Sequence, residues 1–268
     1  MVAACYHRQP EVRLASAIQK TFKCIEALAR SPSGLTVSEV ATVAGFSRPA
    51  ATRLLEGLMA DAIILRDARS KRYRLGLRLY EWANTAVQAA MPINIARKEF
   101  IKLSMEIRRE CNFTVLEDTD AILLERAEDI DGIPLNRPVT GRRPWFQTAS
   151  GRSIVGFSDP ATIKSVLDRT AKRKDVPPYD PAQLNADLQA VRQQGYATIT
   201  GMRPEGFISL AVPILAQSGF ATAAVGTFLR PNEFDSAAGA EIIAQLKSTA
   251  SRVSHYLGFE TEAAALVS

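Results

Sequence analysis

The sequence predicts an α+β protein in two parts: an N-terminal winged helix-turn-helix domain and a larger domain with an antiparallel sheet. In the first third of the chain, apolar residues recur at helical spacing and a basic hairpin follows them. In the remainder, helical stretches are mixed with short strand-like runs, which is the pattern of an α+β domain. The length of 268 residues favours two domains over one.

Positive charge is concentrated in the first third of the chain. The net charge is +5, and residues 1–90 contain 13 Lys and Arg against 7 Asp and Glu. Residues 91–268 contain 20 basic residues against 21 acidic residues. This asymmetry indicates that the N-terminal part meets a polyanion such as double-stranded DNA, although a merely soluble basic surface is the alternative.

The composition argues against several other classes of protein. With 47% hydrophobic and 23% charged residues and no long apolar run or leader, we expect a cytoplasmic protein without a membrane partner. The cysteines Cys5, Cys24 and Cys111 are scattered, and His7 and His255 lie at opposite ends. We therefore expect no disulfide framework, no metal site and no cofactor.

The first two predicted helices form the start of a helix-turn-helix. An apolar stripe runs from Leu14 to Leu28 and stops at the loop Ser31-Pro32-Ser33-Gly34, where helix-breaking residues cluster. A short second helix follows over residues 37–44, and Gly45-Phe46 forms a tight turn after it. This order of elements is typical of DNA-binding modules.

The third predicted helix has the character of a recognition helix. Ser47 is a good N-cap, and Pro49 is tolerated in the first turn. Arg48, Thr52 and Arg53 fall away from the apolar side of this helix, where they could reach base edges in the major groove. These five residues are the candidate groove contacts, and a solvated helix surface is the alternative for the two arginines.

A basic hairpin follows the recognition helix. Residues 62–65 and 73–76 are strand-like and flank a polar tip, so they predict a wing. We expect Arg69, Lys71 and Arg72 to pair with phosphates, unless the hairpin is an ordinary charged turn. The predicted DNA-binding domain spans residues 12–76.

The second predicted domain covers residues 92–260, after a linker helix over residues 77–91 that ends at Met91-Pro92. Its elements are helices over 95–109, 161–171 and 181–194, strands over 112–116, 121–125, 196–199, 207–212 and 221–228, and a final helix that Asp235 caps and that ends near Tyr256.

The motifs of both domains resemble those of IclR-type regulators. Residues 34–79, GLTVSEVATVAGFSRPAATRLLEGLMADAIILRDARSKRYRLGLRL, are similar to that family's DNA-binding domain, including the RYRLG exit from the wing. The motifs QTASGRS (147–153), QQGYA (193–197) and EGFISLAVPI (205–214) follow in the family's order. Within the family, VTGRRPWFQTASG and ISLAVPI are most similar to regulators of hydroxyphenylpropionate and other aromatic-acid catabolism.

The resemblance implies a DNA-binding transcription regulator rather than an enzyme. It implies a GAF-like effector-binding domain with a six-stranded sheet, an operator in double-stranded DNA, and a small-molecule effector, which is an aromatic or other organic acid. Homodimers or homotetramers are expected, because symmetric pairs read two half-sites. RNA polymerase is a further candidate partner.

The position of the effector pocket in IclR-type regulators implies which residues of this sequence contact the effector. The helix start at Ala149, Ser150 and Gly151 would offer backbone N–H groups to an anion. Ser209 stands where relatives use a small polar residue, and Ile199, Gly226 and Phe228 stand where regulators of small hydroxy or keto acids place acidic or hydroxyl side chains.

The apolar residues among these candidates favour a particular ligand class. Ile199 and Phe228 cannot satisfy a small polar acid but suit an apolar or aromatic body. Arg142 and Arg143 are candidate partners for its carboxylate, with surface solvation as the alternative. The adjacent Trp145 fits either ligand contact or core packing.

Two other functions fit the sequence less well. One is an enzyme that acts on a small organic acid and carries an accessory nucleic-acid-binding module. However, Ser150 lacks a G-x-S-x-G frame and has no histidine near it in sequence, so no catalytic residue is indicated. The other is a regulator that needs no ligand and acts through protein partners.

Overall fold

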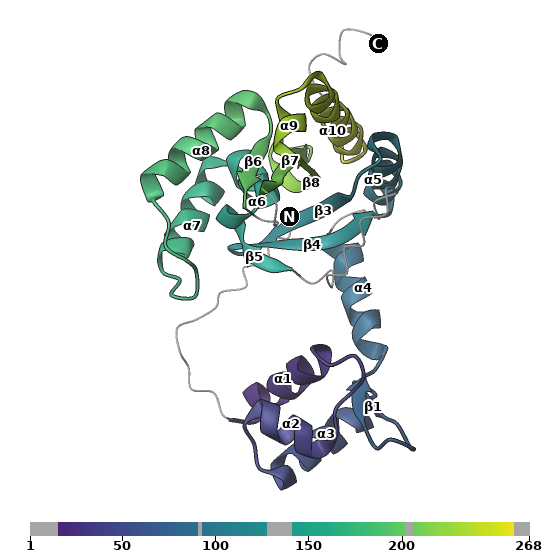
Figure 1. Ribbon diagram of the computed structural model, residues 1–268. Helices are drawn as coiled ribbons and strands as arrows, with labels where there is room; N and C mark the ends of the chain where they lie inside the picture. The colour runs from purple at the N-terminus through teal and green to yellow at the C-terminus, as the bar shows by residue number, and fades with distance from the viewer. Residues whose placement is uncertain (1–15, 91–92, 128–140, 202–205, 260–268) are drawn as a thin grey trace. The chain divides into compact units, whose positions relative to one another are not determined.

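The computed structural model describes residues 16–90, 93–127, 141–201 and 206–259, and the chain divides into two compact units, Met1–Met91 and Pro92–Ser268 (Figure 1). The elements of the first unit are α1 (Ser16–Ala29), α2 (Val37–Ala44), α3 (Arg48–Ala60), β1 (Ile64–Arg66), β2 (Tyr73–Leu75) and α4 (Arg78–Ala90). Strands β1 and β2 pair antiparallel and form the predicted wing.

Local sequence signals set the geometry of the first unit. Thr36 and Glu39 form a capping box at the start of α2, and Gly45 ends α2 with a left-handed φ of 74°. Buried apolar residues from α1, α2, α3 and the wing then form one core, which includes Leu28, Leu55 and Tyr73. This core fixes the angle at which α3 follows α2 and the position of the wing beside α3.

The second unit is built on a six-stranded sheet in the order β5-β4-β3-β8-β7-β6, in which every neighbouring pair is antiparallel. Its strands are β3 (Cys111–Glu117), β4 (Asp120–Ala127), β5 (Arg142–Pro144), β6 (Ala197–Thr200), β7 (Ile208–Leu215) and β8 (Ala221–Leu229). Its helices are α5 (Ile93–Ile107), the 3-10 helix η1 (Trp145–Gln147), α6 (Ala149–Gly156), α7 (Pro160–Ala171), α8 (Pro181–Gln194), α9 (Pro231–Phe234) and α10 (Ala237–Tyr256).

Helices cover both faces of this sheet. Helix α6 packs on β8 and β7, while α5 and α10 pack against each other and on β3 and β7. Phe113 of β3 contacts Phe100 of α5, whereas Gly226 of β8 faces Ser150 of α6. Because side chains alternate between the faces of a strand, these contacts divide the sheet into an α6 face and an α5/α10 face.

The predicted α+β class is confirmed, with a winged helix-turn-helix and an antiparallel sheet. One local prediction was wrong, and one strand was missed. Ser236, not Asp235, caps the final helix, because its side chain accepts from Gly239 N–H and Asp235 ends the short α9. Strand β5, which the arginine-rich sequence did not indicate, pairs with β4 at the edge of the sheet.

Among the residues that the structure describes, no helix is long and apolar enough to cross a lipid bilayer. Within the same residues, no three His, Cys, Asp or Glu side chains converge as metal ligands would.

Candidate nucleic-acid interface and effector site

Helix α3 separates its apolar residues from its basic residues. Ala51, Leu55 and Leu58 are buried in the core of the unit. Arg48 and Arg53 are exposed, and their guanidinium groups make no hydrogen bond or ion pair with any described residue. The fold therefore leaves two positive side chains on the outer surface of the second helix of a helix-turn-helix, as a recognition helix requires.

The start of α3 adds polar groups to the same surface. Ser47 is the N-cap residue, as predicted, but its side chain makes no capping hydrogen bond, so the hydroxyl stays available to another acceptor or donor. Pro49 is exposed in the first turn. Thr52 is half-buried and donates its hydroxyl proton to the Arg48 carbonyl, which leaves its oxygen lone pairs exposed on one side.

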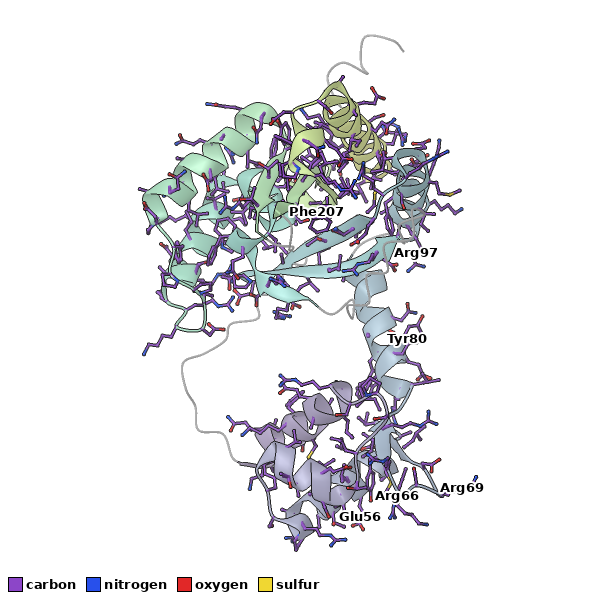
Figure 2. The ribbon with its side chains drawn as sticks, in the orientation of Figure 1. Glu56, Arg66, Arg69, Tyr80, Arg97 and Phe207 are labelled. Atoms are coloured by element: carbon purple, nitrogen blue, oxygen red, sulfur yellow. The ribbon has the colours of Figure 1, made fainter. Side chains whose placement is uncertain are left out.

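The wing tip is held by one aspartate. Asp67 accepts hydrogen bonds from the backbone N–H groups of Ser70 and Arg69, and these bonds, Ser70 first, lower the pKa of Asp67. Arg69 and Lys71 are exposed on this hairpin (Figure 2 labels Arg66 and Arg69). The tip thus presents cations in a fixed turn, which suits contacts to a phosphate backbone.

Sequence reasoning missed two further wing cations. Arg66 and Arg74 are exposed on β1 and β2, and Arg66 stacks over the Tyr73 ring. Arg66 begins the polar run between the two strand-like segments and Arg74 lies in the second of them, so their positive charge was the one signal that the sequence offered for both.

Arg72 corrects the prediction for the wing. Its guanidinium donates to the Gly34 carbonyl at 2.8 Å and pairs with the Glu39 carboxylate at 3.0 Å. The pKa of Glu39 is lowered by the Thr36 backbone N–H first, and Arg72 adds to this effect. Arg72 therefore joins the wing to the start of α2, and we assign it to the fold rather than to phosphate binding.

The register of the sheet brings several candidate effector residues together. Ile199, Ser209 and Phe228 are direct cross-strand partners on β6, β7 and β8. They lie on the α6 face, two residues along from the row Ala197, Ala211 and Gly226. Ser209 is buried and the other two members of the first row are half-buried.

Gly226 and Ser150 serve the packing of α6 on this face. A Cβ at Gly226 would lie 2.8 Å from the Leu210 carbonyl oxygen and 3.4 Å from Ser150 Oγ. The glycine therefore allows α6 to approach the strand closely, and Ala149 is fully buried in the same layer. Ser150 itself is 8% exposed, so its hydroxyl lies within the α6 layer.

The start of α6 offers fewer free N–H groups than predicted. The side chain of Thr148 caps the helix and accepts from Gly151 N–H at 2.9 Å. Gly151 also has no room for a side chain, because a Cβ there would lie 2.2 Å from the Trp145 carbonyl oxygen. Gly151 is thus a packing residue, and its N–H is not available to an anion in this arrangement.

Trp145 is a core residue. Its side chain is fully buried, and the indole N–H donates to Thr170 Oγ1 at 2.9 Å. Its burial and this hydrogen bond favour the core-packing alternative for Trp145 over ligand contact.

The two neighbouring arginines point to opposite faces of the sheet. Arg142 pairs in register with Ile122 and forms ion pairs with Glu117 and Asp120. Arg143 pairs with Ala121, which is opposite Leu116 in the α6 layer. Strand alternation therefore leaves Arg143, but not Arg142, on the side of the candidate pocket, which corrects the prediction for Arg142.

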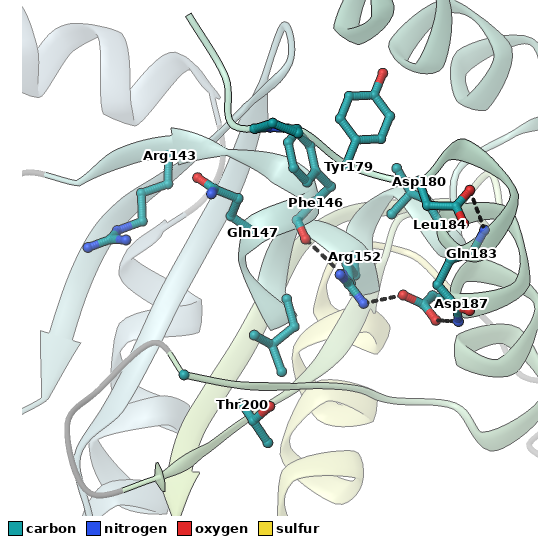
Figure 3. Close-up of a pocket in the computed structure, with 13 residues that line it drawn as sticks. Arg143, Phe146, Gln147, Arg152, Tyr179, Asp180, Gln183, Leu184, Asp187 and Thr200 are labelled. Atoms are coloured by element: carbon teal, nitrogen blue, oxygen red, sulfur yellow. Dashed lines mark hydrogen bonds and ion pairs between the residues drawn. The ribbon is translucent and has the colours of Figure 1, made fainter.

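A pocket of about 410 Å³ lies between η1, the start of α6, α8 and the end of β6 (Figure 3). Phe146 and Tyr179 form an aromatic pair on one side of it, with ring centroids 4.7 Å apart. Arg152 is already occupied there, because it donates to the Phe146 carbonyl and pairs with Asp187. Ile199 and Arg143 also line the pocket, with the Arg143 guanidinium directed away from the aromatic pair.

Sequence reasoning also missed a half-buried arginine on the α6 face. Gly226 pairs with Asn112 of β3, and Asn112 pairs with Arg126 of β4, so the row of Gly226 continues to Arg126. Arg126 Nε lies 3.1 Å from Glu110 Oε1, and the two side chains are 18% and 4% exposed. Only the pairing register places Arg126 in the same cross-strand row as Gly226, because the two residues are far apart in sequence.

Comparisons with known proteins match both units to domains of the same family of regulators. The family described as bacterial transcriptional regulator IclR C-terminal matches residues 85–255, and the IclR helix-turn-helix domain matches residues 17–67. The chain is 23% identical to the HTH-type transcriptional regulator KdgR of Dickeya chrysanthemi, over 97% of this chain and 85% of that protein.

Two further similarities bear on the second unit. The chain is 26% identical to the Pca regulon regulatory protein of Pseudomonas putida, over 75% of this chain and 69% of that protein. The solved structure of an IclR homolog complexed with 4-hydroxybenzoate, from Microbacterium hydrocarbonoxydans, has a TM-score of 0.74 and 22% identity. That likeness covers 90% of this chain and 99% of the other, and it shows the shared fold.

Proposed function

Because this chain belongs to the IclR family of bacterial transcriptional regulators, we propose that it binds operator DNA through α3 and the wing under the control of an organic acid. The observation that carries this proposal is the pair of exposed, unengaged guanidinium groups of Arg48 and Arg53 on α3. Ser47, Pro49 and Thr52 complete the groove surface, and Arg69 and Lys71 contact phosphates from the wing. The protein acts in the cytoplasm, where its operator lies.

Binding to the chain's own promoter region tests the DNA interface. We expect Arg48→Ala and Arg53→Ala each to weaken operator binding by about 1–3 kcal/mol, measured by gel shift at fixed salt. Lys164→Ala removes the same charge from an exposed site on α7 and serves as the matched control. Unchanged affinity in both arginine variants would remove α3 as the recognition helix.

Exposed apolar side chains on the first unit support a homodimer. Ile18 and Phe22 lie one turn apart on α1 and are 60% and 61% exposed, and Tyr80 at the start of α4 is 68% exposed. Neighbouring exposed apolar groups such as the pair on α1 indicate a protein interface, and a two-fold dimer would present two recognition helices to two half-sites. Pairing of dimers into tetramers and contact with RNA polymerase are consistent with this arrangement.

Sedimentation measures this assembly. Phe22→Glu should shift the protein toward the monomer at micromolar concentration, because it places a charge in the proposed interface. Val43→Glu changes an apolar residue of equal exposure on α2 and should leave the mass unchanged. Dimers of undiminished stability in the Phe22 variant would exclude α1 from the interface.

We propose further that the effector is an organic acid with an aromatic body, bound on the α6 face of the second unit. Ile199 and Phe228 supply apolar surface, and the buried Ser209 supplies a hydroxyl between them. Arg143 at the pocket rim makes no ion pair with a described residue and draws anions toward the pocket. A relative bound to 4-hydroxybenzoate and a Pca regulon regulator support this class.

Thermal shift with a panel of aromatic and aliphatic acids tests the effector class. An acid that binds only the folded protein raises its Tm by mass action. We expect aromatic monocarboxylates to stabilise the second unit and short aliphatic keto acids to have no effect. Stabilisation by the aliphatic acids alone would reject the aromatic class. The family relationship gives no support to the alternative of an enzyme, and turnover of a bound acid would be the finding that revives it.

A further inference from the structure

We infer that Arg126 binds the carboxylate of the effector and that Glu110 beside it restricts the site to monocarboxylates. This inference rests on the proposed effector function and names the residue that recognises the acid. The register places Arg126 in the row of Gly226 and Asn112 on the α6 face, as described above. Phe228 lies in the next row, and its continuation onto the segment before β3 falls at Glu110.

The residue before Arg126 supports the assignment of Arg126 to the α6 face. The neighbouring Glu125 pairs in register with Phe113 and forms an ion pair with Arg97 of α5 (Figure 2 labels Arg97). Alternation along β4 therefore directs Glu125 toward α5 and Arg126 toward the α6 face. Arg97 of α5 and Arg126 of β4 therefore lie on different faces of the sheet. Arg126 lies on the face of Ser209 and Phe228.

The guanidinium of Arg126 has unused donor capacity. Its Nη1 atom is buried, yet it has no hydrogen-bond acceptor among the residues that the structure describes. A buried N–H group without an acceptor costs free energy, so native proteins rarely keep one without a function. A carboxylate is the natural acceptor, because arginine donates two parallel hydrogen bonds to it.

Glu110 determines which acids fit. Its carboxylate lies 3.1 Å from Arg126 Nε and is 4% exposed, so it neutralises one side of the guanidinium. The Arg126–Glu110 pair is neutral, so one ligand carboxylate brings the cluster to a charge of −1, whereas a second carboxylate would bring it to −2 beside Glu110 in a place with little water. Phe228, in the next row of the same face, supplies an apolar ring that favours an aromatic body over a polyol or a short keto acid.

Isothermal titration and thermal shift with defined probes test this assignment on the full-length protein. The probes are 4-hydroxybenzoate, 3-hydroxyphenylpropionate, the amide 4-hydroxybenzamide and the dicarboxylate phthalate. For wild type, we expect an aromatic acid to bind at least about tenfold more tightly than the amide and than phthalate. Arg126→Gln should lose that preference for acid over amide, and Arg126→Lys should keep part of it.

Matched variants separate recognition from folding. Arg97→Gln removes the neighbouring ion pair on the opposite face of β4, so it should leave the affinity for the acid within about twofold. Asn112→Asp keeps Arg126 and the size of its neighbour but adds a carboxylate beside the guanidinium, so it should weaken acid binding about tenfold. This second variant keeps the test valid even if Arg126→Gln fails to fold.

The outcomes separate this inference from the proposed function. If neither aromatic acid binds the wild-type protein, the proposed effector class fails, and the assignment of Arg126 falls with it. If an acid binds wild type, Arg126→Gln and Asn112→Asp with equal affinity, the effector class stands and only Arg126 is wrongly assigned. Loss of stability in Arg126→Gln with unchanged acid preference would likewise show that Arg126 is structural.

Discussion

The first unit carries its candidate contacts on the outside of a small core, whereas the second unit keeps its candidates beneath a helix. Arg48 and Arg53 are exposed on α3, and their side chains make no hydrogen bond or ion pair with the residues that the structure describes. Ser209 and Ser150 are buried in the layer between α6 and the sheet.

This difference in burial separates binding from folding in one unit and joins them in the other. An exposed side chain can be removed from the first unit with little effect on stability, because surface substitutions rarely change the free energy of unfolding by more than about 0.5 kcal/mol. A change in the α6 layer alters packing, and therefore affects ligand binding and stability together. Variants of either unit that behave in the opposite way would contradict this difference between the units.

The largest effect is expected from Gly151→Ala in the second unit. The added Cβ would lie 2.2 Å from the Trp145 carbonyl oxygen, which cannot move without shifting η1 away from α6. We expect the second unit to lose about 3 kcal/mol of unfolding free energy, measured by chemical denaturation.

Gly57→Ala is the matched control in the first unit. Gly57 lies in α3 with open space at its Cβ position, so alanine should stabilise the helix by about 0.5–1 kcal/mol. Equal effects of the two glycine variants would contradict the contrast between the units.

A smaller loss is expected when Trp145 is replaced by Phe. The variant keeps an aromatic ring but deletes the N–H that donates to Thr170, at a cost of about 1–3 kcal/mol in the second unit. Acid binding should stay unchanged in calorimetric titration, because Trp145 is a core residue. A selective loss of acid affinity with full stability would instead return Trp145 to the effector site.

Acid pH should lower the stability of the first unit, because it protonates the Glu39 carboxylate. The lowered pKa of this carboxyl, caused first by the Thr36 backbone N–H, means that the ionised form stabilises the folded unit at neutral pH. That contribution is lost as the pH falls through the lowered pKa. Glu39→Gln should therefore be less stable at pH 7 and show a flatter loss toward acid pH in denaturation curves. A variant whose curve parallels wild type would show that the ionised Glu39 carboxylate contributes nothing to stability.

The smallest expected effect distinguishes the two wing arginines Arg69 and Arg72. Arg69→Ala should reduce the salt dependence of operator binding by about one phosphate contact and leave stability unchanged. Arg72→Ala should lower stability, because Arg72 bonds Gly34 and Glu39. Measurement of both variants by anisotropy across a salt series would contradict our assignment if Arg72 alone changed the slope.

The sequence predicted the first unit more completely than the second, for a physical reason. The capping box at Thr36, the turn at Gly45 and the exposed face of α3 depend on residues close together in the chain. Local signals of this kind are visible in a single sequence. Arg72 escaped prediction because its partner Glu39 is 33 residues away.

In the second unit the decisive relations are between distant residues. The short strand β5 has no apolar alternation, so nothing indicated that Arg142 and Arg143 would point to opposite faces. Arg126 reaches the row of Gly226 only through the pairing of β4 with β3 and of β3 with β8. Element types follow from periodicity, but register depends on the whole sheet.

The most direct test of the regulatory account is operator affinity with and without a bound acid. Fluorescence anisotropy of the operator should be titrated with wild-type protein at fixed salt, with and without saturating aromatic acid identified by thermal shift. We predict a change of about fivefold or more in operator Kd, in either direction, since allosteric coupling free energies are about 1–3 kcal/mol. Superimposable binding curves at saturating acid would contradict control of the first unit by the second.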